Sequence, residues 1–159
     1  MKKVFIVLAL VVLAIVPVAA KGVMGVGLEA GNPSGVTFDY KIDEKWEGYT
    51  TVGFAFVGGK ALDFVVGGQY KVTDFNIGKA QFDVKVGLQA GGILWLGDNS
   101  GFGIAVRGTG AVVYDWTWKN VGDFSAYIRL GLGVGIGISG DHAGAGFSFS
   151  GAIGCVYHF

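Results

Sequence analysis

The sequence predicts an all-β protein, an eight-stranded antiparallel up-and-down transmembrane β-barrel with short turns. Three observations lead to this prediction: apolar and polar residues alternate with a period of two, glycine and aromatic residues are abundant, and charged residues are scarce. The 159 residues include 30 glycines, 14% aromatic and 15% charged residues, against ~25% charged residues in soluble domains. Strands with one apolar and one polar face, in so apolar a chain, indicate a sheet between lipid and a polar interior.

The chain begins with the features of a cleavable export signal. Lys2 and Lys3 form a basic start, residues 4–16 are apolar, and small residues precede the expected cleavage position. The apolar run is shorter than the ~20 residues that a membrane-spanning helix needs, which favours a signal peptide over an uncleaved anchor. We therefore expect residues 1–20 to be a signal peptide and residues 21–159 to form one barrel domain.

The remaining composition excludes several classes of protein. No later apolar run approaches the length of a membrane helix, so a lipid-embedded chain must instead close a β-sheet on itself. The high content of aromatic and β-branched residues excludes disorder, and a net charge of +0 gives no signal of nucleic-acid binding. Cys155 is the only cysteine, and its place on the apolar register favours a small hydrophobic role over a reactive thiol.

The first four strands are expected at residues 23–30, 36–42, 49–57 and 62–72. In each, apolar side chains occupy one register and small or polar side chains the other. The apolar registers are, in order, Met24, Val26 and Leu28; Val36, Phe38, Tyr40 and Ile42; Val52, Phe54 and Phe56; and Leu62, Phe64, Val66, Tyr70 and Val72. The separating segments are a Gly-Asn-Pro-Ser-Gly turn, a charged connection over residues 43–47 and a Gly-Gly-Lys turn.

The last four strands are expected at residues 80–94, 102–116, 124–138 and from about residue 145 to the end. Their apolar registers are Phe82, Val84, Val86, Leu88 and Ala90; Phe102, Ile104, Val106, Val112, Tyr114 and Trp116; Phe124, Ile128, Leu130, Leu132, Val134, Ile136 and Ile138; and Phe147, Phe149, Ile153, Cys155, Tyr157 and Phe159. Residues 73–79 are expected to be the longest connection. Every segment reaches or approaches the ~9–11 residues of a tilted transmembrane strand.

Aromatic residues are expected to form two belts around the barrel, one near each rim. Tyr40, Tyr70, Phe82, Tyr114, Trp116, Phe124, Tyr157 and Phe159 fall near one rim, and Phe54, Phe56, Phe64, Trp95, Phe102 and Phe147 near the other. Mostly aliphatic residues and glycine lie between the belts, as in transmembrane barrels. A soluble lipocalin-like barrel would instead turn its apolar register inward.

The export signal, the alternating strands and the ending Tyr157-His158-Phe159 resemble those of small eight-stranded bacterial outer-membrane β-barrels. The resemblance covers all of residues 21–159 and implies a place in the outer membrane among membrane lipids. It also implies that the outer-membrane assembly machinery reads Tyr157 and Phe159 as an assembly signal. Such barrels usually carry long extracellular loops, whereas the outer turns here are short, which argues against the adhesin and receptor roles of long loops.

The polar register is expected to face the lumen and to carry a balanced set of charges. Five carboxylates and five cations make up this set: Glu29, Asp39, Asp63, Asp83 and Asp115, with Lys41, Lys71, Lys85, Arg107 and Arg129. Unpaired buried charge is costly, so the balance predicts an internal ion-pair network that plugs the lumen. Most long side chains gather in the half near the termini. Glycine and serine line the other half, either to accommodate coiled strands or to form a shallow cup.

We expect a monomeric structural or interaction protein that is not an enzyme and needs no cofactor, metal or nucleic-acid partner. A narrow channel or a small-molecule-binding barrel that uses the cup remains an alternative. A lipid-modifying enzyme is a second one, since His142 follows Asp141 and lies near Ser139 in the last turn. The sequence alone fixes no arrangement of nucleophile, base and orienting group, and it contains no cluster with metal-ligand spacing.

Overall fold

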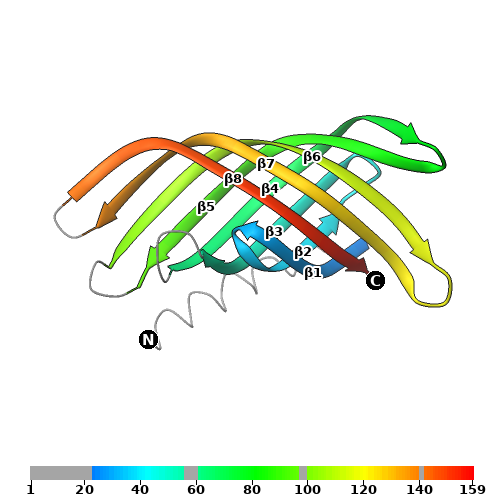
Figure 1. The fold of residues 1–159 in the computed structure, drawn as a ribbon, viewed down its shortest axis with the longest axis horizontal. Coiled ribbons are helices and arrows are strands. Elements are labelled where there is room, and N and C mark those ends of the chain that lie inside the picture. Colours follow the sequence, from blue (N-terminus) through cyan, green and yellow to red (C-terminus); the bar gives the residue numbers. More distant parts are fainter. Residues whose placement is uncertain (1–22, 56–60, 97–99, 140–141) are drawn as a thin grey trace.

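Eight antiparallel strands form a closed ring in chain order (Figure 1), in which each strand pairs with the next and the last pairs with the first. The structure is a computed structural model, and it describes residues 23–55, 61–96, 100–139 and 142–159. The expected signal peptide lies outside the described residues. No helix in the described ranges is long and apolar enough to cross a bilayer. The predicted all-β, up-and-down topology is confirmed.

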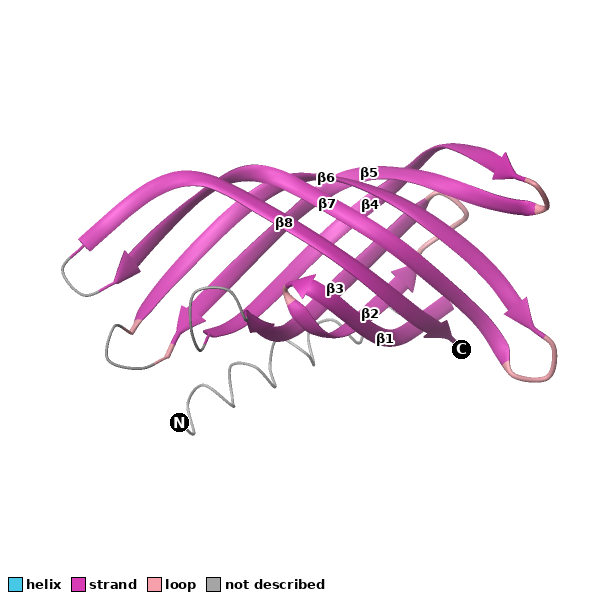
Figure 2. Ribbon diagram, in the orientation of Figure 1, coloured by secondary structure: helices cyan, strands magenta, loops and turns pink. Residues whose placement is uncertain are grey.

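The strands fall into a short group and a long group (Figure 2). The first three have 8–10 residues and the other five have 16–18. Their bounds are β1 (Val23–Asn32), β2 (Ser34–Lys41), β3 (Trp46–Ala55), β4 (Ala61–Ile77), β5 (Ala80–Trp95), β6 (Gly101–Trp118), β7 (Gly122–Ser139) and β8 (His142–His158). The ring therefore has a low wall at β1–β3 and a tall wall at β4–β8.

The expected long connection at residues 73–79 is wrong. β4 continues to Ile77, and β5 begins at Ala80 after a two-residue turn. Gly78 has a φ of 64° there, a conformation that glycine adopts without steric cost. An irregularity between Lys71 and Thr73 shifts the pairing of the two strands, and this shift hides the alternation that marks a strand.

The charged connection at residues 43–47 is shorter than expected, because β3 begins at Trp46. The carboxylate of Asp43 accepts hydrogen bonds from the backbone N–H groups of Lys45 and Trp46, at 2.7 Å each, and so closes the turn. These two donors hold the pKa of the Asp43 carboxyl below its usual value. Glu47 consequently lies inside the strand, on the register that faces the interior of the ring.

The two registers face as the sequence predicts. Leu132 on the apolar register of β7 is 65% exposed, whereas Thr37 and Gln69 on polar registers are 0% and 1% exposed. The surface of the ring is thus apolar and its interior is polar, the reverse of the arrangement in a soluble domain.

Following one residue's partners around the ring gives the stagger of the strands. From Val26 the partners are, in order, Phe38, Thr50, Val66, Ala90, Val106, Val134 and Phe147. On β8, Phe147 precedes Ala152 by five residues, and Ala152 pairs with Gly31 of β1. Because the two strands are antiparallel, Phe147 is level with a position five residues after Gly31. The circuit therefore returns to the chain ten residues beyond Val26, where it began. A stagger of this kind tilts the strands and gives eight of them an interior just wide enough for side chains.

Aromatic rings form a continuous arc on the outer surface, at the end of the ring that holds Phe159. Neighbouring rings lie 5.2–6.3 Å apart from centroid to centroid along the series Phe75, Phe82, Tyr114, Trp116, Phe124, Tyr157 and Phe159. The arc contains six of the eight aromatic residues expected at this rim, and Phe75 extends it. Tyr70 instead packs against Trp46, with ring centroids 5.0 Å apart.

The expected belt at the opposite rim is correct in part. Phe54, Phe64, Phe102 and Phe147 point outward, and Phe56 lies outside the described residues. Trp95 does not join them, because it stands on the inward register of β5. A Cβ atom added at Gly103 or Gly137 would lie 3.0 or 3.3 Å from Cη2 of its ring.

Inward glycines on β7 allow the strands to approach closely, which predicts an unequal response to alanine. A Cβ atom at Gly133 would overlap the carbonyl oxygen of Val106, whereas one at the outward Gly110 meets nothing within 4 Å. We expect Gly133→Ala to lower the free energy of unfolding by about 1–3 kcal/mol because of overpacking. Gly110→Ala should leave it nearly unchanged. Urea titrations in detergent measure both, and equal effects would contradict the close approach.

Candidate functional site

The polar interior has three levels along the axis of the ring. We call them the vestibule, the middle layer and the cup. The vestibule, at the end that holds Phe159, is a cavity of about 340 Å³ lined by charged side chains. The middle layer is centred on Arg129. The cup, at the opposite end, is a cavity of about 400 Å³.

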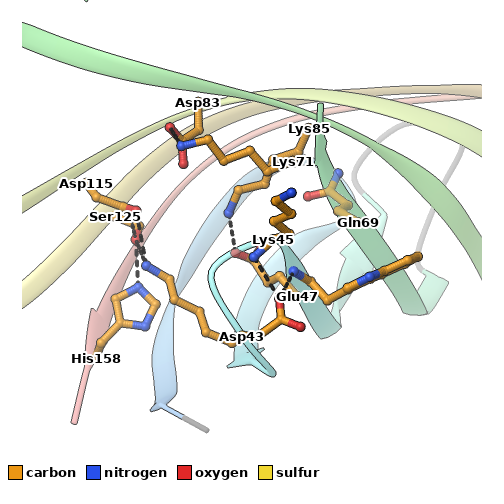
Figure 3. A network of polar contacts seen from close by, with 12 residues as sticks. Asp43, Lys45, Glu47, Gln69, Lys71, Asp83, Lys85, Asp115, Ser125 and His158 are labelled. Carbon is orange, nitrogen blue, oxygen red and sulfur yellow. Dashed lines mark hydrogen bonds and ion pairs between the residues drawn. The ribbon is translucent and has the colours of Figure 1, made fainter. Parts of the chain in front are cut away.

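Ion pairs fill the vestibule (Figure 3). Lys71 Nζ lies 2.6 Å from a carboxylate oxygen of Asp83, and Lys85 Nζ lies 2.5 Å from Glu47 Oε2. Lys41 Nζ lies 3.2 Å from Asp115 Oδ2. The Lys71–Asp83 pair joins the neighbouring strands β4 and β5, whereas the other two pairs join strands that are not consecutive, β5 with β3 and β2 with β6.

Glu47 is a member of this network that the sequence reasoning missed. It is buried, and it is the ion-pair partner of Lys85. Its assignment to a charged connection concealed it, although counting back by twos from Thr51 through Tyr49 reaches Glu47 on the inward register. The described interior therefore holds six carboxylates against five Lys and Arg side chains.

Ser125 lies between Asp115 and His158 at the edge of the vestibule (Figure 3). The Ser125 hydroxyl donates to Asp115 Oδ1, and His158 Nε2 lies 2.6 Å from Ser125 Oγ. In a serine hydrolase the carboxylate contacts the other nitrogen of the histidine and orients its ring. Here Asp115 contacts the serine, and His158 Nδ1 has no partner among the described residues. The arrangement therefore lacks an orienting group for a general base.

Arg129 occupies the centre of the middle layer. Its guanidinium carbon lies 3.5 Å from the ring centroid of Tyr49 and 4.5 Å from that of Tyr127. Its Nη1 lies 3.3 Å from Glu29 Oε2, which also accepts a hydrogen bond from the hydroxyl of Tyr127. A cation held between two aromatic faces and a carboxylate fills the narrow interior at this level.

A layer of uncharged hydrogen bonds adjoins Arg129 on the side of the cup. The hydroxyl of Tyr49 donates to Gln89 Oε1 at 2.9 Å, and Gln89 Nε2 donates to Ser150 at 2.9 Å. Gln69 donates to Thr109 at 3.4 Å. These side chains are buried, so the middle layer separates the vestibule from the cup.

The cup has a charged floor and an aromatic wall. Arg107 Nε donates to the hydroxyl of Ser148 at 2.8 Å, and Asp63 lines the cup nearby. Trp95 stands at the side, in the space left by Gly103 and Gly137. The glycine-lined half of the interior thus contains both space and a large side chain that fills part of it.

Three of the ten expected network residues make no ion pair with any described residue: Asp39, Asp63 and Arg107. Asp39 is buried, and its Oδ1 has no hydrogen-bond partner among the described residues. The other seven pair as described above. Of the catalytic alternative, the side chains of His142 and Ser139 lie outside the described part, as does Asp141.

Tyr157 and Phe159 lie where β8 meets both of its neighbours. The Tyr157 hydroxyl donates to the carbonyl of Val121 at 3.3 Å, and Phe159 N donates to Met24 O at 2.8 Å. Both rings belong to the aromatic arc. Their expected role as an assembly signal stays a prediction.

Comparisons with family models, with curated proteins and with solved structures found no match to the chain. Within the described residues, no group of three or more His, Cys, Asp or Glu side chains could hold a metal ion.

The middle layer predicts a strong coupling between Arg129 and Glu29. Arg129→Met leaves a buried carboxylate without its partner, which should lower the free energy of unfolding by about 3–5 kcal/mol. The double variant with Glu29→Gln removes both charges and should recover much of that loss. Lys41→Met, at the partly exposed pair with Asp115, should cost about 0–1 kcal/mol. Urea titrations compare the variants, and additive effects of Arg129→Met and Glu29→Gln would contradict the coupling.

Proposed function

We propose that the chain is a small integral membrane β-barrel of the bacterial outer-membrane kind, with a structural or interaction role and a closed lumen. The observation that carries this proposal is the inverted distribution of side chains. Apolar residues cover the outside of the ring and a charged network fills its inside. Such a distribution is costly in water and favourable in lipid, where a closed ring also leaves few backbone groups unpaired.

The aromatic arc supports the same proposal. Trp and Tyr side chains favour the boundary between lipid and water, and the arc lies at one rim of the ring, next to the charged turn at Asp43. The exposed aliphatic residues of β7 begin beyond it at Ile128 and continue to Ile138. This order of aromatic and aliphatic residues fits a strand that enters lipid at the arc.

The proposed route to the membrane follows from the two ends of the chain. Residues 1–20 would direct export and be removed, and the assembly machinery would read Tyr157 and Phe159. The partners of the mature protein would be membrane lipids, and we propose that it is a monomer.

A closed lumen favours the structural or interaction role over the channel alternative. A chain of contacts crosses the interior: Arg129 packs on Tyr49 and Tyr127, and Tyr49 binds Gln89. The vestibule and the cup are separate cavities on its two sides. The Ser125–His158 contact, without an orienting group, gives no support to an enzyme. The cup favours small-molecule binding as the second candidate.

The membrane-spanning proposal predicts that an arginine on the outer surface destabilises the protein more in the middle of the bilayer than at its edge. Leu132 lies in the middle of β7 and Val121 lies in the turn before it, and both are more than half exposed. In lipid vesicles, Leu132→Arg should lower the free energy of unfolding by about 2–4 kcal/mol, and Val121→Arg by about 0–1 kcal/mol. Unfolding titrations in vesicles measure both. Equal small costs would show that Leu132 does not face hydrocarbon.

Planar-bilayer recordings test the closed lumen. The unmodified protein should give no steady ion conductance, because the middle layer spans the interior. Replacing Arg129 and Tyr49 together by alanine removes the bulk of that layer and should open measurable conductance. Large, ion-selective currents from the unmodified protein would overturn the closed lumen and favour the channel.

A further inference from the structure

The wall of the ring has a step between β1 and β8. The two strands pair from Gly25–His158 as far as Asn32–Gly151, where β1 ends in its turn to β2. β8 extends beyond this point over residues 142–150, paired with β7 alone. Figure 1 shows this part of β8, in orange, reaching well past the β1–β2 turn. Within the described part of the chain, no strand lies against this edge of β8.

The cup lies directly behind the step. Its lining includes Asn32 at the end of β1. It also includes Gly144, Gly146 and Ser148, on the part of β8 that pairs with β7 alone. A Cβ atom added at Gly144 or Gly146 would meet nothing within 4 Å. The described residues therefore leave the cup open to the side of the ring as well as at its end.

Apolar side chains surround the step on the outside. Phe147 is 93% exposed, and Phe149 beside it is also exposed. Ile136 and Ile138 of β7, which pair with β8 at the level of the step, are more than half exposed. If the ring spans a membrane, the step thus opens into hydrocarbon. Hydrocarbon cannot bind the free backbone N–H and C=O groups of β8, so a polar group must reach them.

Inside the step, the cup offers one cation and one anion that lie too far apart to form an ion pair with each other. Arg107 is half-buried and binds Ser148 through Nε. Asp63 is buried, and it attracts Arg107 electrostatically without forming an ion pair with it. The indole of Trp95 lines the same cavity. A ligand with separate positive and negative groups matches this floor better than one with a single charge.

We propose that the step is a binding site for a single-chain zwitterionic phospholipid drawn from the surrounding membrane. Its phosphate binds Arg107, and its ammonium group binds Asp63 beside Trp95. Its glycerol backbone lies along the free edge of β8, and its acyl chain stays outside against Phe147 and Phe149. A cavity of about 400 Å³ is in the range of small-molecule sites. This inference rests on the proposed membrane-spanning function.

A second copy of the chain does not fit the step. Two barrels inserted in the same direction are related by an axis along the membrane normal. Their strands tilt by ~35–45° from that normal, so the two β8 edges would cross steeply and could not form a hydrogen-bonded ladder.

Binding can be followed by the fluorescence of Trp95. The other three tryptophans are replaced by phenylalanine, at Trp46, Trp116 and Trp118, and the protein is folded into phosphatidylglycerol vesicles. We expect lysophosphatidylethanolamine to change the Trp95 emission saturably. Anionic lysophosphatidylglycerol lacks the ammonium group that binds Asp63, and it should bind about tenfold more weakly. Lysophosphatidylethanolamine should bind the Arg107→Gln variant about tenfold more weakly, because the contact of its phosphate with Arg107 is lost. Each change removes one charge-assisted contact.

A matched pair of glycine variants locates the site. Gly146→Phe fills the cup and should abolish the response, whereas Gly110→Phe places the same ring on the outward face of β6 and should preserve it. Equal responses of these two inserted variants would overturn the site, and so would equal binding of the two lysolipids. Saturation by water-soluble glycerophosphoethanolamine at the same concentration would overturn entry from the membrane.

Insertion is measured separately, by heat-modifiable electrophoretic mobility. Protein that does not insert overturns the proposed membrane-spanning function. Inserted protein whose Trp95 emission does not respond overturns the lipid site alone. If Gly146→Phe fails to insert, lysophosphatidylethanolamine binding to Arg107→Gln is compared with its binding to the protein with an unmodified cup. Equal binding of the two proteins would then overturn the proposal.

Discussion

The pairing of β1 with β8 is the contact on which the rest of the structure depends. It joins residues at the two ends of the described chain, from Gly25 with His158 to Asn32 with Gly151. Once the sheet closes after eight strands, its interior is just wide enough for its own side chains to span it, as they do in the middle layer. Most inward charges then pair with another inward side chain, and every outward residue faces the solvent around the ring. The closure thus separates the polar register, which it encloses, from the apolar register, which it leaves on the surface.

Much of the fold could be predicted from the sequence because successive residues of a strand face opposite sides of the sheet, and their polarity alternates when the two sides differ. That signal gave the strand count and the facing of each register. It failed where a second signal competed with it. Thr73, Asp74 and Asn76 resemble a loop in composition, yet they continue β4 past an irregularity in its pairing. Trp95 resembles a member of an aromatic belt, but its position two residues after Ile93 places it on the inward register.

Less of the candidate site could be predicted, because partners across the ring depend on the stagger of the strands. The sequence identifies Lys85 as an inward cation, but only the register brings Glu47 to it. With Glu47 included, the described carboxylates outnumber the Lys and Arg side chains, and Asp39 is left without an ion pair. The stacking of Arg129 between Tyr49 and Tyr127 joins β3 with β7. No local pattern in the sequence predicts this contact. The side opening has the same origin, since it follows from β1 being shorter than β8.

The most direct test of the central claim, that the apolar register faces lipid, is the solvent accessibility of spin labels on neighbouring registers. Labels are attached to single cysteines at Ile128, Leu130 and Val134 outside, and at Thr109 and Ser150 inside, in a Cys155→Ala background and in vesicles. The outward labels should collide frequently with oxygen, which concentrates in lipid, and rarely with a water-soluble nickel complex. The inward labels should collide rarely with oxygen. Outward labels as accessible to the nickel complex as to oxygen would show that water, not lipid, surrounds the ring.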